Sequence, residues 1–425
     1  MRSRSLVLWL SLALASAAGA QRESGLPRAI RPDAEGFSPA RLARIDSLIQ
    51  PLVASGRIPG AVALVTRHGR VVYEKAFGYR DVGTRAPLKS DDIFRIASQT
   101  KAITSTAVMM LWEEGRFGLD DPIERYIPEF AKPTVLTRFN PADSSWTGEP
   151  ARRSITIRTL LTHSSGLDYP SIGSDEFKAI YAKAGVPSGL GVPPGVTLAE
   201  KMRLLGKLPL KHQPGERFTY GLSLDLLGYF VEVISGMPLD RFFRTRIFEP
   251  LGMRDTWFYL PADRAGRLVA LHDSTGGGKA RARHDVVEGI DPDWPAKPGT
   301  YFSGGGGLVS TAEDYARFLQ LYLNGGEFNG ARLLGPRTIA MMLTDQLPLL
   351  PMEHGLAFGL ETSANDYQTP RNAGSFSWGG AFATTYWADP KEGLIGILYT
   401  NTWNLPAANV LGGRFPAVVY AALIH

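Results

Sequence analysis

Ser98 and Lys101 stand three positions apart in a segment that runs Phe94-Arg-Ile-Ala-Ser-Gln-Thr-Lys101. The apolar residues that follow at helical spacing are Ile103, Ala107, Met110 and Leu111. This spacing predicts a helix whose first turn holds the hydroxyl and the amine on one face. A serine needs a partner that takes its proton before it attacks a carbonyl carbon, and a lysine whose pKa is lowered by burial could serve. The N-terminal amides of the helix would stabilise the resulting oxyanion.

A simpler interpretation is that Ser98 caps a helix and that Lys101 is a solvated helix residue. A Ser-x-x-Lys pattern arises about once by chance in a chain of this length and composition. Lys101 is nevertheless the only one of the twelve lysines with a serine three residues before it. The pattern also follows a predicted strand, which is the context that this motif requires. The local context therefore favours a catalytic serine.

The elements that must position this pair lie at both ends of a chain of 425 residues, 44% hydrophobic and 20% charged. Predicted helices cover 38–52, 222–235, 239–248, 315–324 and 407–423, and predicted strands cover 61–66, 70–77, 382–388 and 394–400. Ser38 followed by Pro39 is typical of a helix start. We expect one hydrolase unit over 21–425, with an α/β subdomain from about 38–120 and 300–425 and a mostly helical subdomain from about 120–300.

Four further segments match those of a known family. They are Ile155–Leu167, Pro214–Tyr220, Gly306–Asp314 and Ser377–Ala381. With the Ser-x-x-Lys motif, they make the chain resemble the superfamily of serine β-lactamases, D-Ala-D-Ala peptidases and related esterases from about Ser38 to Thr400. The resemblance implies a β-lactamase-like α/β (α+β) fold, in which helices flank an antiparallel sheet and a mostly helical lobe is inserted. It also implies catalysis without a cofactor.

The resemblance assigns proton transfer to Tyr220 together with Lys101. Tyr220 follows a Pro-Gly-Glu-Arg-Phe-Thr segment and directly precedes a predicted helix, as the family's tyrosine does. Leu222 stands where β-lactamases of class C have an asparagine that holds a substrate amide, so the amide-binding role is not carried over. The alternative for Tyr220 is an ordinary buried aromatic residue with a satisfied hydroxyl.

The residues Trp378, Gly379 and Gly380 replace the family's Lys-Thr-Gly or His-Thr-Gly on the strand beside the nucleophile. A lysine or histidine there helps to bind the carboxylate of β-lactams and peptides, whereas tryptophan offers an apolar face and one N–H donor. The two glycines would let an acyl group approach the backbone, and the amide of Ala381 would join that of Ser98 in an oxyanion hole. This pattern resembles the esterase branch, the family VIII carboxylesterases, and favours ester hydrolysis.

Two other functions stay open. The chain could be a β-lactamase or a D-amino-acid or cell-wall peptidase, or it could be a non-catalytic protein that binds penicillin or cell-wall material. The joint presence of Ser98, Lys101 and Tyr220 speaks against the non-catalytic alternative. In each case the expected ligand is a small-molecule ester or amide. Loops with Asp168, Tyr169 and 301–303 flank the cleft in the family, although such residues more often pack or face solvent.

Several other chemistries are disfavoured. His163 suggests a Ser-His pair, but the resemblance makes its Leu-Leu-Thr-His-Ser-Ser-Gly segment a structural loop, and no Gly-x-Ser-x-Gly elbow occurs. The other histidines have no metal-ligand spacing and cysteine is absent, so we expect no metal. The run Gly304–Gly307 precedes no Gly-Lys-Ser, which favours a turn over a phosphate loop. The sequence has no dense basic tract of the kind that would predict binding of nucleic acid.

The first 20 residues have the anatomy of a cleavable export signal. Arg2 and Arg4 precede an apolar run over 6–15, and Ala18-Gly19-Ala20 fits the small-residue cleavage rule. The run is shorter than the roughly 18 residues that span a bilayer, so we expect no membrane span in the mature form. Removing two arginines from a net charge of +5 leaves +3. We therefore expect a periplasmic or secreted enzyme without disulfides.

Overall fold

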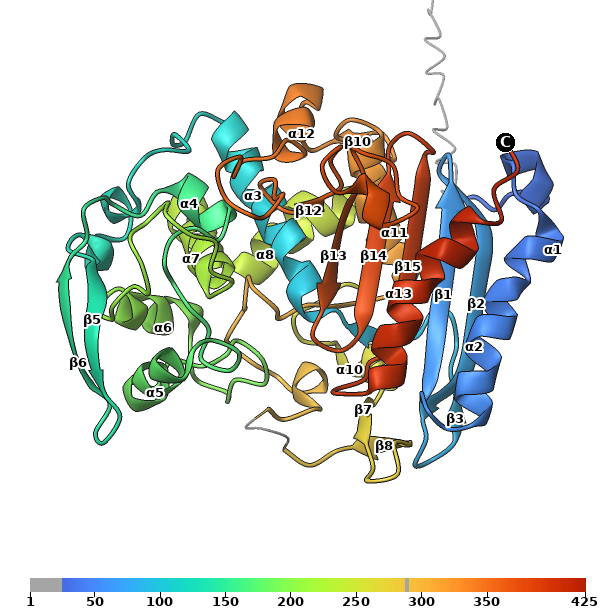
Figure 1. Cartoon of the computed structure of the whole chain (residues 1–425), viewed down its shortest axis with the longest axis horizontal. Helices are drawn as coiled ribbons and strands as arrows, with labels where there is room; N and C mark the ends of the chain where they lie inside the picture. Colours follow the sequence, from blue (N-terminus) through green and yellow to red (C-terminus); the bar gives the residue numbers. More distant parts are fainter. Residues whose placement is uncertain (1–24, 287–289) are drawn as a thin grey trace, which may run out of the picture.

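The computed structural model describes residues 25–286 and 290–425, so the predicted export signal over 1–20 lies outside the described residues. A seven-stranded antiparallel sheet dominates one half of the molecule (Figure 1), in the order β12-β13-β14-β15-β1-β2-β3. Its strands are β1 (Gly60–Arg67), β2 (Arg70–Asp81), β3 (Ala86–Pro87), β12 (Gly359–Leu360), β13 (Phe376–Gly380), β14 (Thr384–Asp389) and β15 (Leu394–Tyr399). The chain thus pairs its first strands with its last, which confirms the expected antiparallel sheet.

Strand β1 is buried along its whole length because helices cover both faces of the sheet. Ala61, Ala63 and Val65 belong to the core under α2 (Arg44–Ala54) and α13 (Pro406–Tyr420). Val62 and Leu64 point to the opposite core, which includes residues of α3 (Thr100–Glu113) and α11 (Ala312–Leu323). The alternation follows from the two-residue period of a strand. A strand buried on both faces therefore has a continuous apolar sequence.

Most predicted elements are confirmed, with boundaries that shift by a few residues. The turn between β1 and β2 lies at His68 and Gly69, both with positive φ. Ser38 caps α1 (Pro39–Leu42) by accepting a hydrogen bond from the Arg41 amide. Thr311 does the same for α11 with the amide of Asp314. Side-chain oxygens at these positions satisfy backbone donors that a helix start leaves unpaired.

The region between about 120 and 300 is mostly helical but also contains two hairpins that the sequence analysis missed. Its helices are α4 (Ile157–Leu161), α5 (Asp175–Ala184), α6 (Leu198–Leu205), α7 (Ser223–Ser235), α8 (Leu239–Phe243), α9 (Glu249–Leu251) and α10 (Ala262–Ala265). The hairpins are β5 (Thr134–Asn140) with β6 (Ser145–Pro150), and β7 (Leu271–Ser274) with β8 (Ala280–Arg283). Most residues of β5 and β6 are not buried, so these strands lack the apolar alternation that marks a half-buried strand.

One buried cluster extends from the sheet through α3 into the helices of the 120–300 region. The expected boundary between two subdomains therefore stays a prediction. The remaining α-helix of the described part of the chain is α12 (Pro336–Met342), and α8 continues into a single π-helical turn, η5 (Arg244–Phe248). Within residues 25–286 and 290–425, no helix has the length and apolar character needed to cross a bilayer.

A glycine-rich segment, Ser303–Leu308, passes between α3 and α7, and we call it the strap. From α3, Thr104 donates a hydrogen bond to the Gly304 carbonyl (2.6 Å), and Thr100 accepts one from the Leu308 amide (3.1 Å). On the α7 side, a Cβ at Gly304 would lie 2.5 Å from the Leu224 carbonyl oxygen. Position 304 is a glycine because no side chain fits between the two helices there.

Gly304→Ala should lower the free energy of unfolding by about 1–3 kcal/mol, because the new methyl group meets backbone that cannot move aside. The control is Gly413→Ala, on the exposed side of α13, where the new Cβ meets no atom within 4 Å apart from its chain neighbours and the backbone of its own helix. Alanine there should stabilise by up to about 1 kcal/mol through helix propensity. Urea unfolding of both variants tests this, and equal effects would contradict the described packing of the strap.

Candidate active site

Ser98 lies in a single 3-10 turn, Ala97–Gln99, that joins β4 (Phe94–Arg95) to α3. Ala97 has φ +43°, an uncommon conformation for a residue with a side chain. The sharp turn leaves the Ser98 side chain partly exposed, whereas Lys101 is 3% exposed. The Lys101 Nζ atom lies 3.3 Å from Ser98 Oγ, and it donates a hydrogen bond to it. The structure thus brings the predicted pair together.

Lys101 has three hydrogen-bond acceptors, which matches the three donors of an ammonium group. Besides Ser98 Oγ, it donates to the hydroxyl of Tyr169 at 3.0 Å and to the carbonyl of Gly305 at 2.6 Å. Burial acts to lower the pKa of Lys101, but Tyr169, Tyr220 and Asp225 outweigh it and hold the pKa above its ordinary value. The expectation of a lowered pKa from the sequence is therefore wrong, because it counted burial and not these neighbours.

Tyr220 lies beside Lys101, just before α7. The Lys101 Nζ atom is 4.7 Å from the centroid of the Tyr220 ring, within the range of a cation–π contact. Among the described residues, no hydrogen bond joins the Tyr220 hydroxyl to Ser98 or Lys101. The indole N–H of Trp378 donates to that hydroxyl at 3.4 Å. The structure thus links Ser98, Lys101, Tyr220 and Trp378 into one chain of contacts.

Tyr169 is the aromatic residue whose hydroxyl meets Lys101 directly, and the sequence analysis had only placed it near the cleft. Burial raises the pKa of Tyr169, so its phenol is neutral. The neighbouring Asp168 does not face the reacting atoms. Its carboxylate accepts hydrogen bonds from the Tyr169 amide, the Ser174 amide and Lys211, and so it anchors the loop. A buried loop carboxylate of this kind positions Tyr169.

Strand β13 runs alongside the turn that carries Ser98. A Cβ on Gly380 would lie 2.3 Å from the Ile96 carbonyl oxygen, so only glycine allows this approach. Gly379 is partly exposed, and Ala381, in the turn that follows β13, is exposed. These residues thus border the turn, and the oxyanion-hole role of Ala381 stays a prediction.

His163 belongs to an aromatic cluster behind Tyr220 and Trp378 and forms no hydrogen bond with Ser98 in the described structure. Its ring lies 4.8 Å from that of Tyr220 and 6.0 Å from that of His354. Burial lowers the pKa of His163 well below its ordinary value, and it lowers that of His354 to about 4. Both rings are therefore neutral packing elements at neutral pH. This placement agrees with a structural loop rather than a Ser-His pair.

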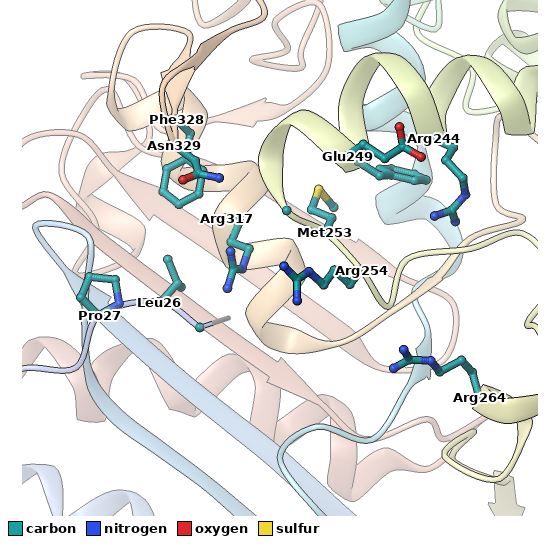
Figure 2. A pocket seen from close by; sticks show the side chains of 13 residues that line it. Leu26, Pro27, Arg244, Glu249, Met253, Arg254, Arg264, Arg317, Phe328 and Asn329 are labelled. Carbon is teal, nitrogen blue, oxygen red and sulfur yellow. The ribbon is translucent and has the colours of Figure 1, made fainter. Parts of the chain in front are cut away.

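Other features of the described residues bear on the alternatives. Residues 25–286 and 290–425 contain no group of three or more His, Asp or Glu side chains placed to hold a metal ion. A cavity of about 690 Å³ is lined by four arginines and the segment Gly25–Pro27 (Figure 2), and none of the predicted site residues reaches it. The site is therefore defined by Ser98 and its neighbours, not by this cavity.

A β-lactamase-like sheet with a serine in the turn before a helix and a buried lysine in the first turn of that helix defines a class of serine hydrolases. The beta-lactamase family model matches residues 45–419. A Mycobacterium tuberculosis protein is 38% identical over 368 residues, covering 83% of this chain and 87% of that protein, and the esterase EstB of Burkholderia gladioli is 33% identical over 389 residues, covering 87% and 93%. The solved structure of EstCE1, "a hydrolase with promiscuous acyltransferase activity", superimposes with a TM-score of 0.76 at 29% identity, covering 92% of this chain and 100% of that chain.

This chain therefore belongs to the beta-lactamase family, and it is a serine hydrolase of that family. The expected fold class and the resemblance to the superfamily are both confirmed. The fold, unlike the choice of substrate, is common to many members of such a family.

The neutral rings of His163 and His354 predict that the folded state loses stability in acid. Between pH 6.5 and pH 4 an unfolded histidine takes up a proton that folded His354, with its pKa of about 4, does not bind, so the folded state weakens as pH falls. This one residue should contribute about 3 kcal/mol of that loss. His354→Phe should flatten the pH dependence of urea unfolding by this amount, and His425→Gln, an exposed histidine, should not. A His354→Phe profile as steep as that of the wild type would contradict it.

Proposed function

We propose that this chain hydrolyses carboxylic esters through an acyl-enzyme on Ser98. The observation that carries the proposal is the Ser98 hydroxyl 3.3 Å from a buried Lys101 ammonium, with the uncharged Trp378 in contact with the neighbouring Tyr220. Trp378 provides no cation for a substrate carboxylate, and its N–H is turned towards Tyr220. The relative EstB is named an esterase, which supports the same substrate class.

In the proposed acylation, Ser98 Oγ attacks the ester carbonyl carbon and its proton passes to the Tyr220 hydroxyl oxygen. The Tyr220 proton passes to the departing alkoxide, so the ester C–O bond breaks and an alcohol leaves. Lys101 remains an ammonium and stabilises the negative charge that develops on these oxygens. The amides of Ser98 and Ala381 hold the oxyanion.

Deacylation follows the same route with water in place of the alcohol. Water attacks the acyl carbon and gives a proton to Tyr220, while Tyr220 returns its own proton to Ser98 Oγ, and the carboxylic acid leaves. Tyr220 fits this role better than Tyr169, because the Tyr169 hydroxyl already binds Lys101 and is buried. Lys101 in this scheme acts by charge rather than as the base.

A second candidate activity is acyl transfer to an alcohol. EstCE1 is described as a hydrolase with promiscuous acyltransferase activity, and it covers 92% of this chain. The chemistry differs only in the nucleophile, since an alcohol replaces water in the attack on the acyl carbon. Formation of a new ester when an alcohol is added to the assay would support it.

We also propose that the enzyme is exported to the periplasm or the medium. The support is the sequence of residues 1–20, whose apolar run and small-residue end fit an export signal. N-terminal sequencing of the secreted protein should begin at Gln21, and retention of the intact chain in the cytoplasm would contradict export.

Steady-state turnover separates the substrate classes. We expect the mature protein to cleave p-nitrophenyl butyrate rapidly and a chromogenic cephalosporin slowly, and Ser98→Ala to lower ester turnover by about 10³-fold or more with the fold intact. Faster cephalosporin cleavage would favour the β-lactamase alternative. Inactivity on both substrates, with stable labelling by penicillin, would favour the binding protein.

Two matched tyrosine variants test the proton path. Tyr220→Phe should lower kcat on p-nitrophenyl butyrate by about 10²–10⁴-fold, the usual contribution of a general acid–base group. Tyr169→Phe removes one acceptor from Lys101 but leaves the proton path, so its kcat should fall less. A larger loss for Tyr169→Phe than for Tyr220→Phe would transfer the proton-relay role to Tyr169.

A further inference from the structure

Asp225 is a buried carboxylate that the proposed mechanism does not use. It is the third residue of α7 and is fully buried. Its Oδ1 atom accepts a hydrogen bond from the Ser303 hydroxyl at 2.5 Å, at the first residue of the strap. Its Oδ2 atom has no hydrogen-bond partner within the described residues, although the Gly305 amide is close enough to stabilise the negative charge. A buried carboxylate of this kind is costly unless a cation balances it.

The nearby cation is Lys101, on the other side of the strap. Gly305 lies between the two groups: its carbonyl accepts from Lys101 Nζ at 2.6 Å, and a Cβ on it would lie 2.2 Å from Asp225 Oδ2. A single residue, Gly305, therefore separates the Lys101 ammonium from the Asp225 carboxylate in space. It also explains why the second glycine of the run admits no side chain.

The charges around the two groups agree with this pairing. Burial raises the pKa of Asp225 and Lys101 lowers it, while Asp225 is one of the groups that raise the pKa of Lys101. The other titratable groups that face the pair are the phenols of Tyr169 and Tyr220 and the ring of His163 near Lys101, and Tyr301 near Asp225. Burial raises the pKa of Tyr169 and of Tyr301, which makes them neutral. Asp225 therefore provides a buried negative charge for Lys101.

We propose that Asp225 is the buried counterion of Lys101 and its positioning residue. Through Ser303 it fixes the strap, and the strap's Gly305 carbonyl in turn holds the ammonium against Ser98. The inference deepens the proposed function and rests on it, because Lys101 must stay charged and in place for the proton path through Tyr220. Asp225 itself touches neither the substrate nor Ser98 in this scheme.

The first test compares Asp225→Asn with Asp314→Asn. Asp314 is the third residue of α11, is also buried, and has a pKa that burial raises to about 7, so it controls for the loss of a buried helix carboxylate. We expect Asp225→Asn to lower kcat/KM on p-nitrophenyl butyrate by about 10- to 100-fold, as expected when a catalytic group is misplaced. The alkaline limb of its pH profile should move to lower pH, since removing an anion lowers the pKa of Lys101. Asp314→Asn should keep the profile of the wild type.

The second test does not depend on activity. The state of Lys101 is followed by NMR of protein labelled with ¹³C at lysine Cε, with the signal assigned by its absence in Lys101→Met. We expect the wild-type signal to keep its ammonium position to pH 10 and the Asp225→Asn signal to titrate at lower pH. Identical titrations in the two proteins would overturn the proposal. A wild type as inactive as Ser98→Ala would refute the ester function, yet this titration would still test Asp225.

If Asp225→Asn does not fold, Ser303→Ala tests the same link. It leaves the carboxylate in place but removes its hydrogen bond to the strap, so we expect a lower kcat/KM with a pH profile like that of the wild type. Unchanged kcat/KM in a folded Ser303→Ala protein would overturn the positioning role.

Discussion

The burial of one ammonium group constrains much of the active site. Lys101 has almost no contact with solvent, so each of its three N–H donors must find an acceptor within the protein. The acceptors come from three segments far apart in the sequence: Ser98 in the 3-10 turn just before α3, Tyr169 in the loop after α4, and Gly305 in the strap. Each of these segments must therefore be held in place for Lys101 to remain charged.

The packing of the strap follows from this requirement. A carbonyl oxygen can approach the ammonium only if the chain passes closely between α3 and α7, and glycines at 304 and 305 permit that passage. The same kind of close approach occurs at Gly380, which meets the Ile96 carbonyl just before the Ser98 turn. Both contacts place backbone, rather than side chains, around the nucleophile. Backbone amides and carbonyls are well suited to hold charge in a buried site because they are fixed by the fold.

Local patterns in the sequence predicted much of this arrangement. The three-residue spacing of Ser98 and Lys101 requires only a helix to bring them together, and the alternation along β1 requires only a strand. The roles of Tyr220 and Trp378 came from the family resemblance, and the structure places Tyr220 beside Lys101 and Trp378 beside Tyr220.

What local patterns could not provide depends on contacts between distant segments. The pKa of Lys101 rises because Tyr169, Tyr220 and Asp225 surround it, and no spacing in the sequence shows that these residues meet. The β5–β6 hairpin was missed because its strands lie largely at the surface and have no apolar alternation.

The central claim is that Ser98 carries the acyl group during turnover. The most direct measurement is intact-protein mass spectrometry after p-nitrophenyl butyrate is mixed with the enzyme and the reaction is stopped with acid within the first turnovers. The account predicts one butyryl group on the wild-type protein, located on Ser98 by peptide mapping, and none on Ser98→Ala. Acylation of another residue, or ester cleavage by Ser98→Ala at the wild-type rate, would contradict it.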